Sequence, residues 1–166
     1  NDPDIYYWLG ISYVNLYKIN KGILDIKIPQ EERDKIDFYL TEAEKNYLTV
    51  INISSSYQEV YYAYAHLLVY AKEDYEKAKE FLNKYLYEFN TKIDKTNIQK
   101  KEAIPDVKAL FLLGHVYSAL DDYKNAYETY DEIYKYKKNL DKKDLAKLDE
   151  YIRETGKIIE NENKIK

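Results

Sequence analysis

Two histidines are the side chains of this chain best suited to acid–base or metal chemistry. An imidazole titrates near neutral pH and is the commonest metal ligand in proteins. Catalysis at His66 or His115 would need an orienting carboxylate, and a metal site would need a third ligand. Nothing near either histidine supplies such a group at a recognisable spacing. We therefore expect His66 to be a half-buried spacer and His115 to line a groove; a site formed by both imidazoles stays as an alternative.

The remaining residue types offer no other catalytic or cofactor-binding pattern. The chain has no cysteine, which excludes disulfides, thiolate catalysis and cysteine-bound metals. It carries no glycine-rich phosphate loop, no His-Glu-x-x-His and no Gly-x-Ser-x-Gly. Its acidic residues alternate with lysines at helical spacing, as in 42–45 and 73–77, which is typical of a solvated helix face. We expect no enzyme activity, no cofactor and no metal site.

A repeated motif indicates the elements that position these side chains. Its clearest copy reads Leu113-Gly114-x-x-Tyr117, then Tyr123-x-x-Ala126, then Tyr130. Two imperfect copies read Leu9-Gly10-x-x-Tyr13 with Ala43 and Tyr47, and Tyr62, Ala65 and His66 with Ala78. Small residues let two helices approach closely, and large residues three or four places away fill the space beside them. The motif therefore predicts paired helices packed through contacts between small and large residues.

A unit of about 34 residues with this signature resembles the tetratricopeptide repeat. The resemblance implies an all-α fold, here an α-solenoid of antiparallel helix pairs with about seven helices. It also implies a function in holding another protein, because such repeats usually act as binding scaffolds. In this register His66 takes the small-residue position where the other two copies have glycine.

We expect one domain over residues 1–166, made of three repeats and a terminal helix. The expected boundaries are 3–55 for the first repeat with an insertion at 20–29, 57–92 for the second repeat, 93–106 for a loop, 107–139 for the third repeat, and 141–160 for a capping helix. Ser54, Ser55 and Ser56 are expected to cap the second repeat, and Gly156 to fray or kink the last helix. The apolar insertion is either a flap over the helix ends or an edge that meets a partner.

The resemblance also implies a concave groove lined by the first helix of each repeat. Carried over by position, the groove residues are Tyr7, Ile11, Val14, Tyr64, Leu67, Tyr70, Lys108, Phe111, His115 and Ser118. Some members of the family hold a peptide's terminal carboxylate here, but this groove is apolar and aromatic almost throughout, with Asn15 and Lys108 as the obvious polar exceptions. It suits an amphipathic helix or an extended apolar segment of a partner protein. The alternative is that the chain's own loops or termini fill the groove.

Composition limits the other classes of partner. The net charge is −4 with both signs interspersed, which gives no electrostatic footprint for nucleic acid or an anionic membrane. No run approaches the roughly 18 apolar residues of a transmembrane helix, so we expect no direct membrane insertion. The chain lacks methionine and opens on Asn1-Asp2-Pro3-Asp4, so we expect it to be a piece of a longer protein.

These observations lead to a ranked pair of hypotheses about function. The first is a non-enzymatic protein-interaction module. The 21 tyrosines and the many lysines, isoleucines and asparagines indicate an AT-rich genome, and by analogy with repeat proteins of such genomes we expect a bacterial complex, with the envelope as one candidate location. The second is a structural module that stacks on itself, as a homo-oligomer, or on the rest of its own protein. The identity of the partner and the compartment, cytoplasm or envelope, stay open.

Overall fold

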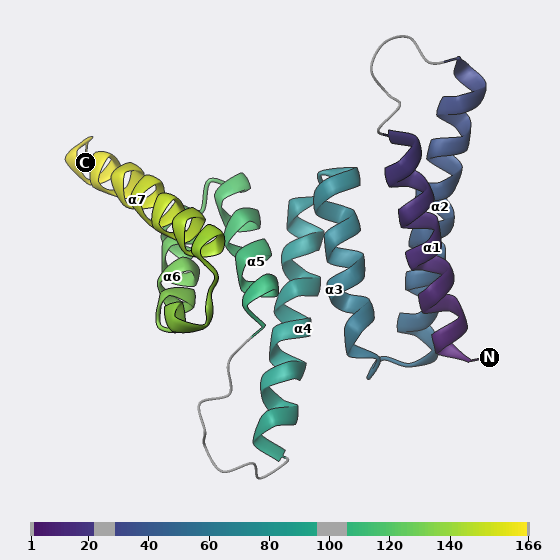
Figure 1. Ribbon diagram of the computed structural model, residues 1–166, viewed down its shortest axis with the longest axis horizontal. Helices are drawn as coiled ribbons and strands as arrows, with labels where there is room; N and C mark the ends of the chain where they lie inside the picture. Colours follow the sequence, from purple (N-terminus) through teal and green to yellow (C-terminus); the bar gives the residue numbers. More distant parts are fainter. Residues whose placement is uncertain (1, 22–28, 96–105, 166) are drawn as a thin grey trace. The chain divides into compact units, whose positions relative to one another are not determined.

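The computed structural model describes residues 2–21, 29–95 and 106–165. Over these ranges the chain forms seven α-helices and no strand, which confirms the expected all-α class (Figure 1). The helices are α1 (Pro3–Lys21), α2 (Gln30–Ile53), α3 (Gln58–Leu67), α4 (Tyr75–Lys95), α5 (Val107–Ala119), α6 (Tyr123–Tyr134) and α7 (Lys142–Ile165). A π-helical turn, Leu68–Lys72, follows α3, and a 3-10 turn, Lys137–Asn139, follows α6.

The helices gather into two compact units, unit 1 over Asn1–Glu73 and unit 2 over Asp74–Lys166. The division falls inside the expected second repeat at 57–92, between its two helices. The expectation of one domain over 1–166 stays a prediction, and each unit is described by itself below.

In unit 1, α1 and α2 run antiparallel and α3 packs against them (Figure 1). Ala43, Tyr47 and Val50 form the buried face of α2 at helical spacing. Across from them, the hydroxyl of the buried Tyr64 donates a 2.6 Å hydrogen bond to the Glu44 carboxylate, which also pairs with the ammonium of Lys72. These contacts fix the rotation of α3 about its own axis against α2.

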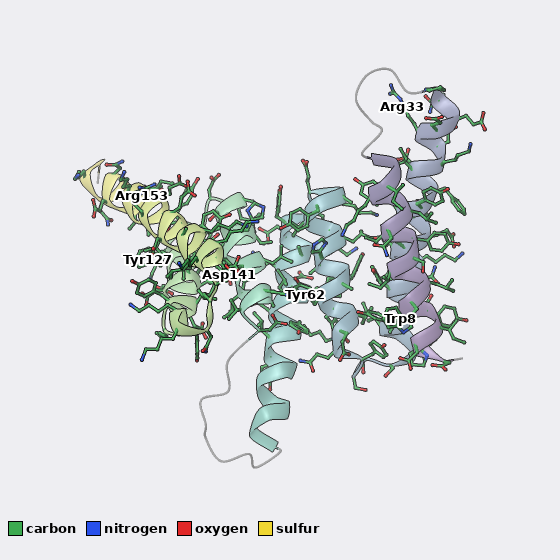
Figure 2. All side chains as sticks on the ribbon, viewed as in Figure 1. Trp8, Arg33, Tyr62, Tyr127, Asp141 and Arg153 are labelled. Atoms are coloured by element: carbon green, nitrogen blue, oxygen red, sulfur yellow. The ribbon has the colours of Figure 1, made fainter. Side chains whose placement is uncertain are left out.

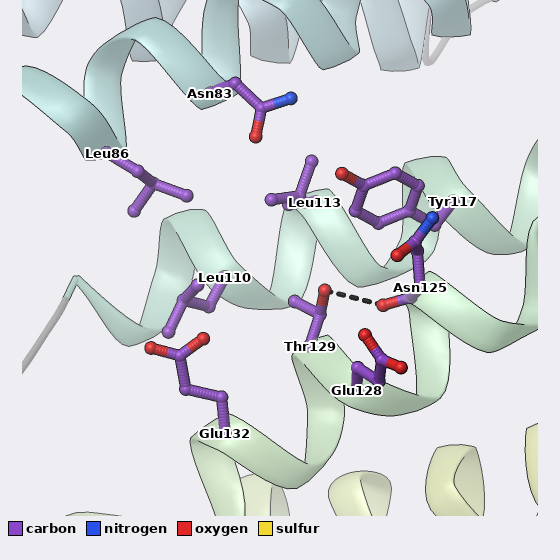
Figure 3. A pocket seen from close by; sticks show the side chains of 9 residues that line it. All are labelled: Asn83, Leu86, Leu110, Leu113, Tyr117, Asn125, Glu128, Thr129 and Glu132. Carbon is purple, nitrogen blue, oxygen red and sulfur yellow. Dashed lines mark hydrogen bonds between the residues drawn. The ribbon is translucent and has the colours of Figure 1, made fainter.

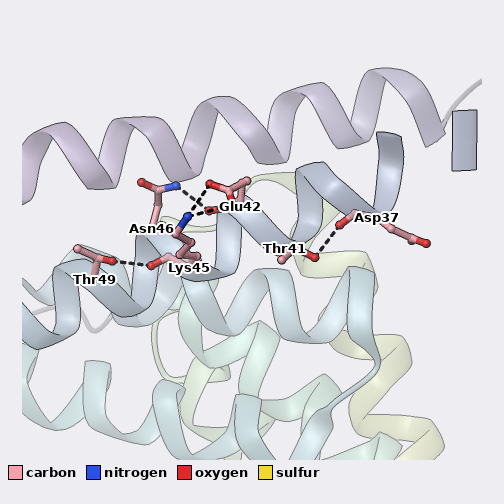
Figure 4. Close-up of polar contacts among 6 residues, drawn as sticks. All are labelled: Asp37, Thr41, Glu42, Lys45, Asn46 and Thr49. Atoms are coloured by element: carbon pink, nitrogen blue, oxygen red, sulfur yellow. Dashed lines mark hydrogen bonds and ion pairs between the residues drawn. The ribbon is translucent and has the colours of Figure 1, made fainter. Parts of the chain in front are cut away.

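A polar face of α2 satisfies its hydrogen bonds locally (Figure 4). The Thr41 and Thr49 hydroxyls each donate a 2.8 Å bond to the carbonyl one turn earlier, and the ammonium of Lys45 lies 3.2 Å from the Glu42 carboxylate. All these contacts join residues of one helix, so this face needs no ligand. The exposed Lys45 fits the solvated face expected at 42–45, but Ala43 is buried and the Glu44 carboxylate contacts Tyr64 and Lys72, so the expectation holds only in part.

In unit 2, two aspartates define the hairpin of α5 and α6. The Asp106 carboxylate caps α5 by accepting from the backbone N–H groups of Lys108 and Ala109, and it also accepts from the Tyr85 hydroxyl of α4 at 2.6 Å. Asp122 caps α6 in the same way, and Asp121 turns the chain with a left-handed φ of 57°. The core below them contains Leu110, Ala126, Tyr130, Ile133 and Leu148, the last from α7.

The structure confirms some of the expected helix ends and caps and contradicts others. The helix that follows the expected insertion at 20–29 begins at Gln30 and ends at Ile53, inside the expected first repeat. The serines at 54–56 do not cap α3, because Tyr57 occupies the N-cap position and no side chain caps the helix. Gly156 does not end the last helix, which runs unbroken to Ile165. Residues 22–28 of the expected insertion and 96–105 of the expected loop lie outside the described residues.

Candidate partner-binding pockets

Gly10 and Gly114 make the same packing contact in the two units. A Cβ atom placed on Gly114 would lie 2.7 Å from Cζ of Tyr130, and one on Gly10 would lie 2.7 Å from Cδ1 of Tyr47. Both distances are far below van der Waals contact, so only glycine lets each tyrosine ring lie across the facing helix. Both rings are almost fully buried. Each ring then forms the floor of a pocket.

The pocket of unit 1 has a volume of about 220 Å³ and lies among α1, α2 and α3. One face of α1 forms one wall, Tyr47 of α2 lies at its base, and α3 forms the other wall. The lining residues are Tyr7, Ile11, Val14, Asn15 and Lys18 of α1, Tyr47 of α2, and Tyr62, Ala63 and His66 of α3. Tyr62 is labelled on α3 in Figure 2.

The end of this pocket near Tyr7 is aromatic and borders acidic groups. The Tyr7 ring lies 5.2 Å from the Tyr57 ring and 6.4 Å from the Tyr47 ring, centre to centre. Burial, and then the charge of Glu59, raise the pKa of Tyr7. Burial likewise raises the pKa of Tyr57, whose hydroxyl also hydrogen-bonds the Asp4 carboxylate. The tyrosines are therefore neutral at physiological pH, and the negative charges lie at this end.

The other end of the pocket is polar and cationic. It is formed by Asn15, the exposed Lys18 and the half-buried His66. Burial, and then the positive charge of Lys18, lower the pKa of His66, so the imidazole is neutral at pH 7. The imidazole ring lies 4.5 Å from the ring of Tyr70 and 6.3 Å from that of Tyr62.

Unit 2 has an equivalent pocket, also of about 220 Å³, among α5, α6 and α7. Tyr130 again forms the base, and its ring stacks on Tyr151 of α7 at 5.1 Å. The other lining residues are His115, Ser118, Tyr123, Glu154, Thr155 and Ile158. Counted from the glycine, His115 and Ser118 stand where Ile11 and Val14 stand in unit 1. The two units therefore build the same kind of pocket with different side chains.

A third pocket, of about 280 Å³, lies among α4, α5 and α6 of unit 2 (Figure 3). Leu110 and Leu113 form its apolar side, and Glu128 and Glu132 of α6 line its acidic side. The Thr129 hydroxyl is occupied by a 2.7 Å hydrogen bond to the Asn125 carbonyl. This pocket is larger, but it contains no residue of the expected groove.

The expected groove residues are distributed unevenly. Tyr7, Ile11 and Val14 meet in the unit 1 pocket, and His115 and Ser118 meet in the unit 2 pocket. The remaining five lie outside the pockets. Three of them are on α5 and the π-helical turn: Phe111 packs edge-on against Tyr151 at 6.5 Å, Lys108 is exposed in the first turn of α5, and Tyr70 is exposed beside His66. The other two are Tyr64 and Leu67. His66 and His115 belong to different units, one to each pocket.

Tyr64 and Leu67 do not line a groove, which corrects the expectation for α3. Their side chains are 0% and 2% exposed and belong to the core. The small residue of this repeat is Ala65, which is fully buried, and not His66. Since one residue turns a helix by about 100°, the one-residue error placed the wrong face toward the groove. With Ala65 as the reference, Tyr62 and His66 correspond to Tyr7 and Ile11, and both line the pocket.

The sequence reasoning also missed Lys18 and Tyr47 as pocket residues. Lys18 could have been found by extending the α1 face by one turn beyond Val14. Tyr47 was recognised only as a large packing residue, and its second role depends on the space between α1 and α3.

Two further observations concern the described residues as a whole. No group of three or more His, Asp and Glu side chains in them could hold a metal ion. None of their helices combines the length and the apolar character that crossing a membrane requires.

Comparison with known proteins agrees with this geometry. A family model of the tetratricopeptide repeat matches residues 107–140, which span α5, α6 and the 3-10 turn. A search of curated proteins found no match. Repeats of this kind typically serve as non-enzymatic protein-interaction modules. Residues 107–140, which include α5 and α6, are therefore similar to a tetratricopeptide repeat.

Proposed function

We propose that this chain is a non-enzymatic interaction module that binds a segment of a partner protein in the pockets of α1–α3 and of α5–α7. The observation that carries the proposal is the recurrence of one pocket in both units, each built on a buried tyrosine that lies across a glycine. A pocket of this size and aromatic character suits an apolar side chain that anchors a bound segment.

Tyrosine-rich walls favour such binding for a physical reason. Tyrosine offers a large apolar ring with few rotatable bonds and a hydroxyl that remains able to hydrogen-bond. Tyr7 of α1 and Tyr62 of α3 both line the unit 1 pocket, so a bound side chain can contact an aromatic ring from either helix. An amphipathic helix or an extended segment could present such a side chain.

The proposal is tested by affinity capture from a lysate of the source cell with three forms of the chain. The first is the parent, and the second is the pocket variant Ile11→Glu/Tyr62→Glu. The matched control is Trp8→Glu/Ile19→Glu, which adds the same charge to the exposed side of α1. All forms are first checked for helicity by circular dichroism.

A protein that is retained by the parent and the control, and lost by the pocket variant, would support binding in the pocket. Equal retention by all three folded forms, or loss only from the control, would refute it for unit 1.

A structural, self-associating role is the second candidate, and one observation favours it. The outward side of α1 exposes five large apolar side chains, each 39% to 67% exposed: Ile5, Trp8, Leu9, Leu16 and Ile19 (Trp8 is labelled in Figure 2). Ile5, Leu9, Leu16 and Ile19 are four, seven and three residues apart, which places them on one side of the helix, where a second helix could pack.

Light scattering over a wide concentration range separates the two candidates. Self-association through α1 predicts a mass that rises with concentration in the parent and stays at the monomer value in Trp8→Glu/Ile19→Glu. Because Trp8 is the single tryptophan, its emission should shift to the blue on association. A monomeric parent at all concentrations would contradict this role.

A further inference from the structure

Resting on the proposed function, we propose that the segment bound in the unit 1 pocket presents an apolar side chain to Ile11, Val14 and Tyr62, and a side-chain carboxylate of Asp or Glu to Lys18. The geometry also assigns a direction to the segment, with its acidic residue at the end of α1 that carries Lys18.

The first support is the charge of the pocket lining. None of the nine residues that line the unit 1 pocket is acidic, and one, Lys18, is cationic. This contrasts with the chain as a whole, whose net charge is −4. It also contrasts with the other two pockets, which carry Glu154 in one case and Glu128 with Glu132 in the other. An anionic ligand group is therefore favoured in the unit 1 pocket and opposed in the others.

The second support is the position of Lys18 along α1. Tyr7, Ile11, Val14 and Lys18 succeed one another on one face, three or four residues apart. Lys18 lies one turn beyond Val14, which is about 6 Å along the axis. Four residues of a helix or two residues of an extended strand span the same length. The bound segment should therefore carry its acidic residue four places from the apolar anchor if it is helical, and two places if it is extended.

The third support is the opposite sign of charge at the other end of the pocket. Glu59 acts electrostatically on Tyr7, and the Asp4 carboxylate accepts the hydrogen bond of Tyr57. A carboxylate on the ligand would be repelled there and attracted at Lys18. A lysine or arginine of the ligand would have the reverse preference, so the two ends together select one direction of binding.

The polar groups beside Lys18 can complete the recognition of a carboxylate. The Asn15 amide offers N–H donors, and the His66 imidazole, which lies close enough to Lys18 to be affected by its charge, offers one more. Lys18 is exposed at the rim, where a side chain of a continuing segment can reach it. We therefore assign the carboxylate to an Asp or Glu side chain and not to the end of a chain.

The test is a selection of short peptides, randomised in sequence and blocked at both ends, against the whole chain. The blocked ends remove any contribution from a terminal carboxylate. Four forms are compared: the parent, Lys18→Glu, the pocket variant Ile11→Glu/Tyr62→Glu, and Lys124→Glu. The last one is the control, because it reverses an exposed lysine on α6 of unit 2.

The expected result is that the parent and Lys124→Glu select peptides with an acidic residue at the predicted offset from an apolar one. Replacing that Glu by Gln in a selected peptide should weaken binding to the parent about two- to fivefold, and should not weaken binding to Lys18→Glu. Lys18→Glu should instead prefer the same peptide with Lys at that place. A purely structural role of Lys18 would not produce this reversal.

Different failures have different meanings. If peptides bind the parent and lose binding to Ile11→Glu/Tyr62→Glu, but show no acidic preference that depends on Lys18, the inference is overturned and the proposed function stands. If no peptide binds, or if the pocket variant binds equally well, both the inference and the proposed function of unit 1 are overturned.

Discussion

Replacing Gly114 with alanine should place a methyl group inside the volume of the Tyr130 ring. The new Cβ atom would lie 2.7 Å from Cζ and 2.9 Å from Cδ1 of that ring. Tyr130 cannot easily move away, because it is 2% exposed and its ring stacks on Tyr151 at 5.1 Å. We therefore expect Gly114→Ala to lower the free energy of unfolding.

The magnitude follows from two opposing contributions. Alanine stabilises the middle of a helix by about 1 kcal/mol relative to glycine. Inserting a methyl group into a packed core costs about 1–3 kcal/mol, and a rigid aromatic ring favours the upper part of this range. The net loss of unfolding free energy for Gly114→Ala should be about 1–2 kcal/mol.

Gly156 provides a matched control in α7. Its Cβ atom would lie 3.6 Å from Cε2 of Tyr127, which is ordinary contact, so Gly156→Ala should gain the helix propensity of about 1 kcal/mol. The two variants should therefore differ by about 2–3 kcal/mol, with opposite signs. For a chain of this length, the midpoints of thermal unfolding should be separated by roughly 4–12 °C.

The assay is urea and thermal unfolding followed by circular dichroism, with Tyr130→Leu as a second background. Removing the ring should convert the Gly114→Ala change from destabilising to stabilising, because only the propensity gain is left. If Gly114→Ala has the same unfolding free energy as Gly156→Ala, the close contact with the Tyr130 ring does not explain why position 114 is a glycine. The same conclusion follows if Gly114→Ala changes the unfolding free energy equally in the parent and in Tyr130→Leu.

Three further predictions concern unit 1. Glu44→Ala removes the carboxylate that accepts from the buried Tyr64 hydroxyl and should cost about 1–3 kcal/mol in urea unfolding, whereas Glu42→Ala, whose carboxylate meets an exposed lysine, should cost less than about 1 kcal/mol. Burial and a hydrogen bond raise the pKa of Tyr57 above 10.0 in the folded state. The neutral Tyr57 side chain therefore contributes fully to the unfolding free energy below pH 10, and this contribution is lost as the pH rises toward the folded-state pKa. Between pH 10 and that pKa, the unfolding free energy should fall more steeply with pH in the parent than in Tyr57→Phe, as followed by tryptophan emission. The pKa of His66 is lowered from 6.5 in the folded state, so the neutral imidazole contributes to the unfolding free energy above that pH, and this contribution is lost as the pH falls. Between about pH 7 and about pH 5, the unfolding free energy of the parent should therefore decrease more than that of His66→Gln. Equal decreases in the two forms would contradict the lowered pKa.

The fold was largely readable from the sequence because its determinants are local. The motif of small and large residues at helical spacing predicted paired helices, and the start of α2 after Pro29 follows from the restrictions around proline. The contacts Gly10–Tyr47 and Gly114–Tyr130 were visible as a small residue and a large residue at corresponding places in two copies of the motif. The continuation of α7 beyond the expected end at 160, as far as Ile165, was not predicted.

The register of α3 shows where the local signal fails. Ala65 and His66 are adjacent, and the motif alone does not say which of them faces the packed interface. The answer depends on Tyr64, whose hydroxyl reaches Glu44 on a different helix, a contact across twenty positions of the chain. Because the side chains of a helix rotate by about 100° per residue, this single ambiguity changed the assignment of Tyr62, Tyr64, His66 and Leu67.

The repeat motif does not predict the charge of either pocket. The recurring residues, a glycine and a tyrosine, form the same base in both units and carry no charge. The charge comes from residues around the buried tyrosine. These are Lys18, in the last part of α1, for the unit 1 pocket and Glu154 of α7 for the unit 2 pocket. Two pockets with one geometry thus acquire opposite charges, and partner selectivity should follow these outer residues. Exchanging the charges by Lys18→Glu and Glu154→Lys should therefore change which segment each pocket prefers while leaving both folds intact, because neither side chain belongs to the core.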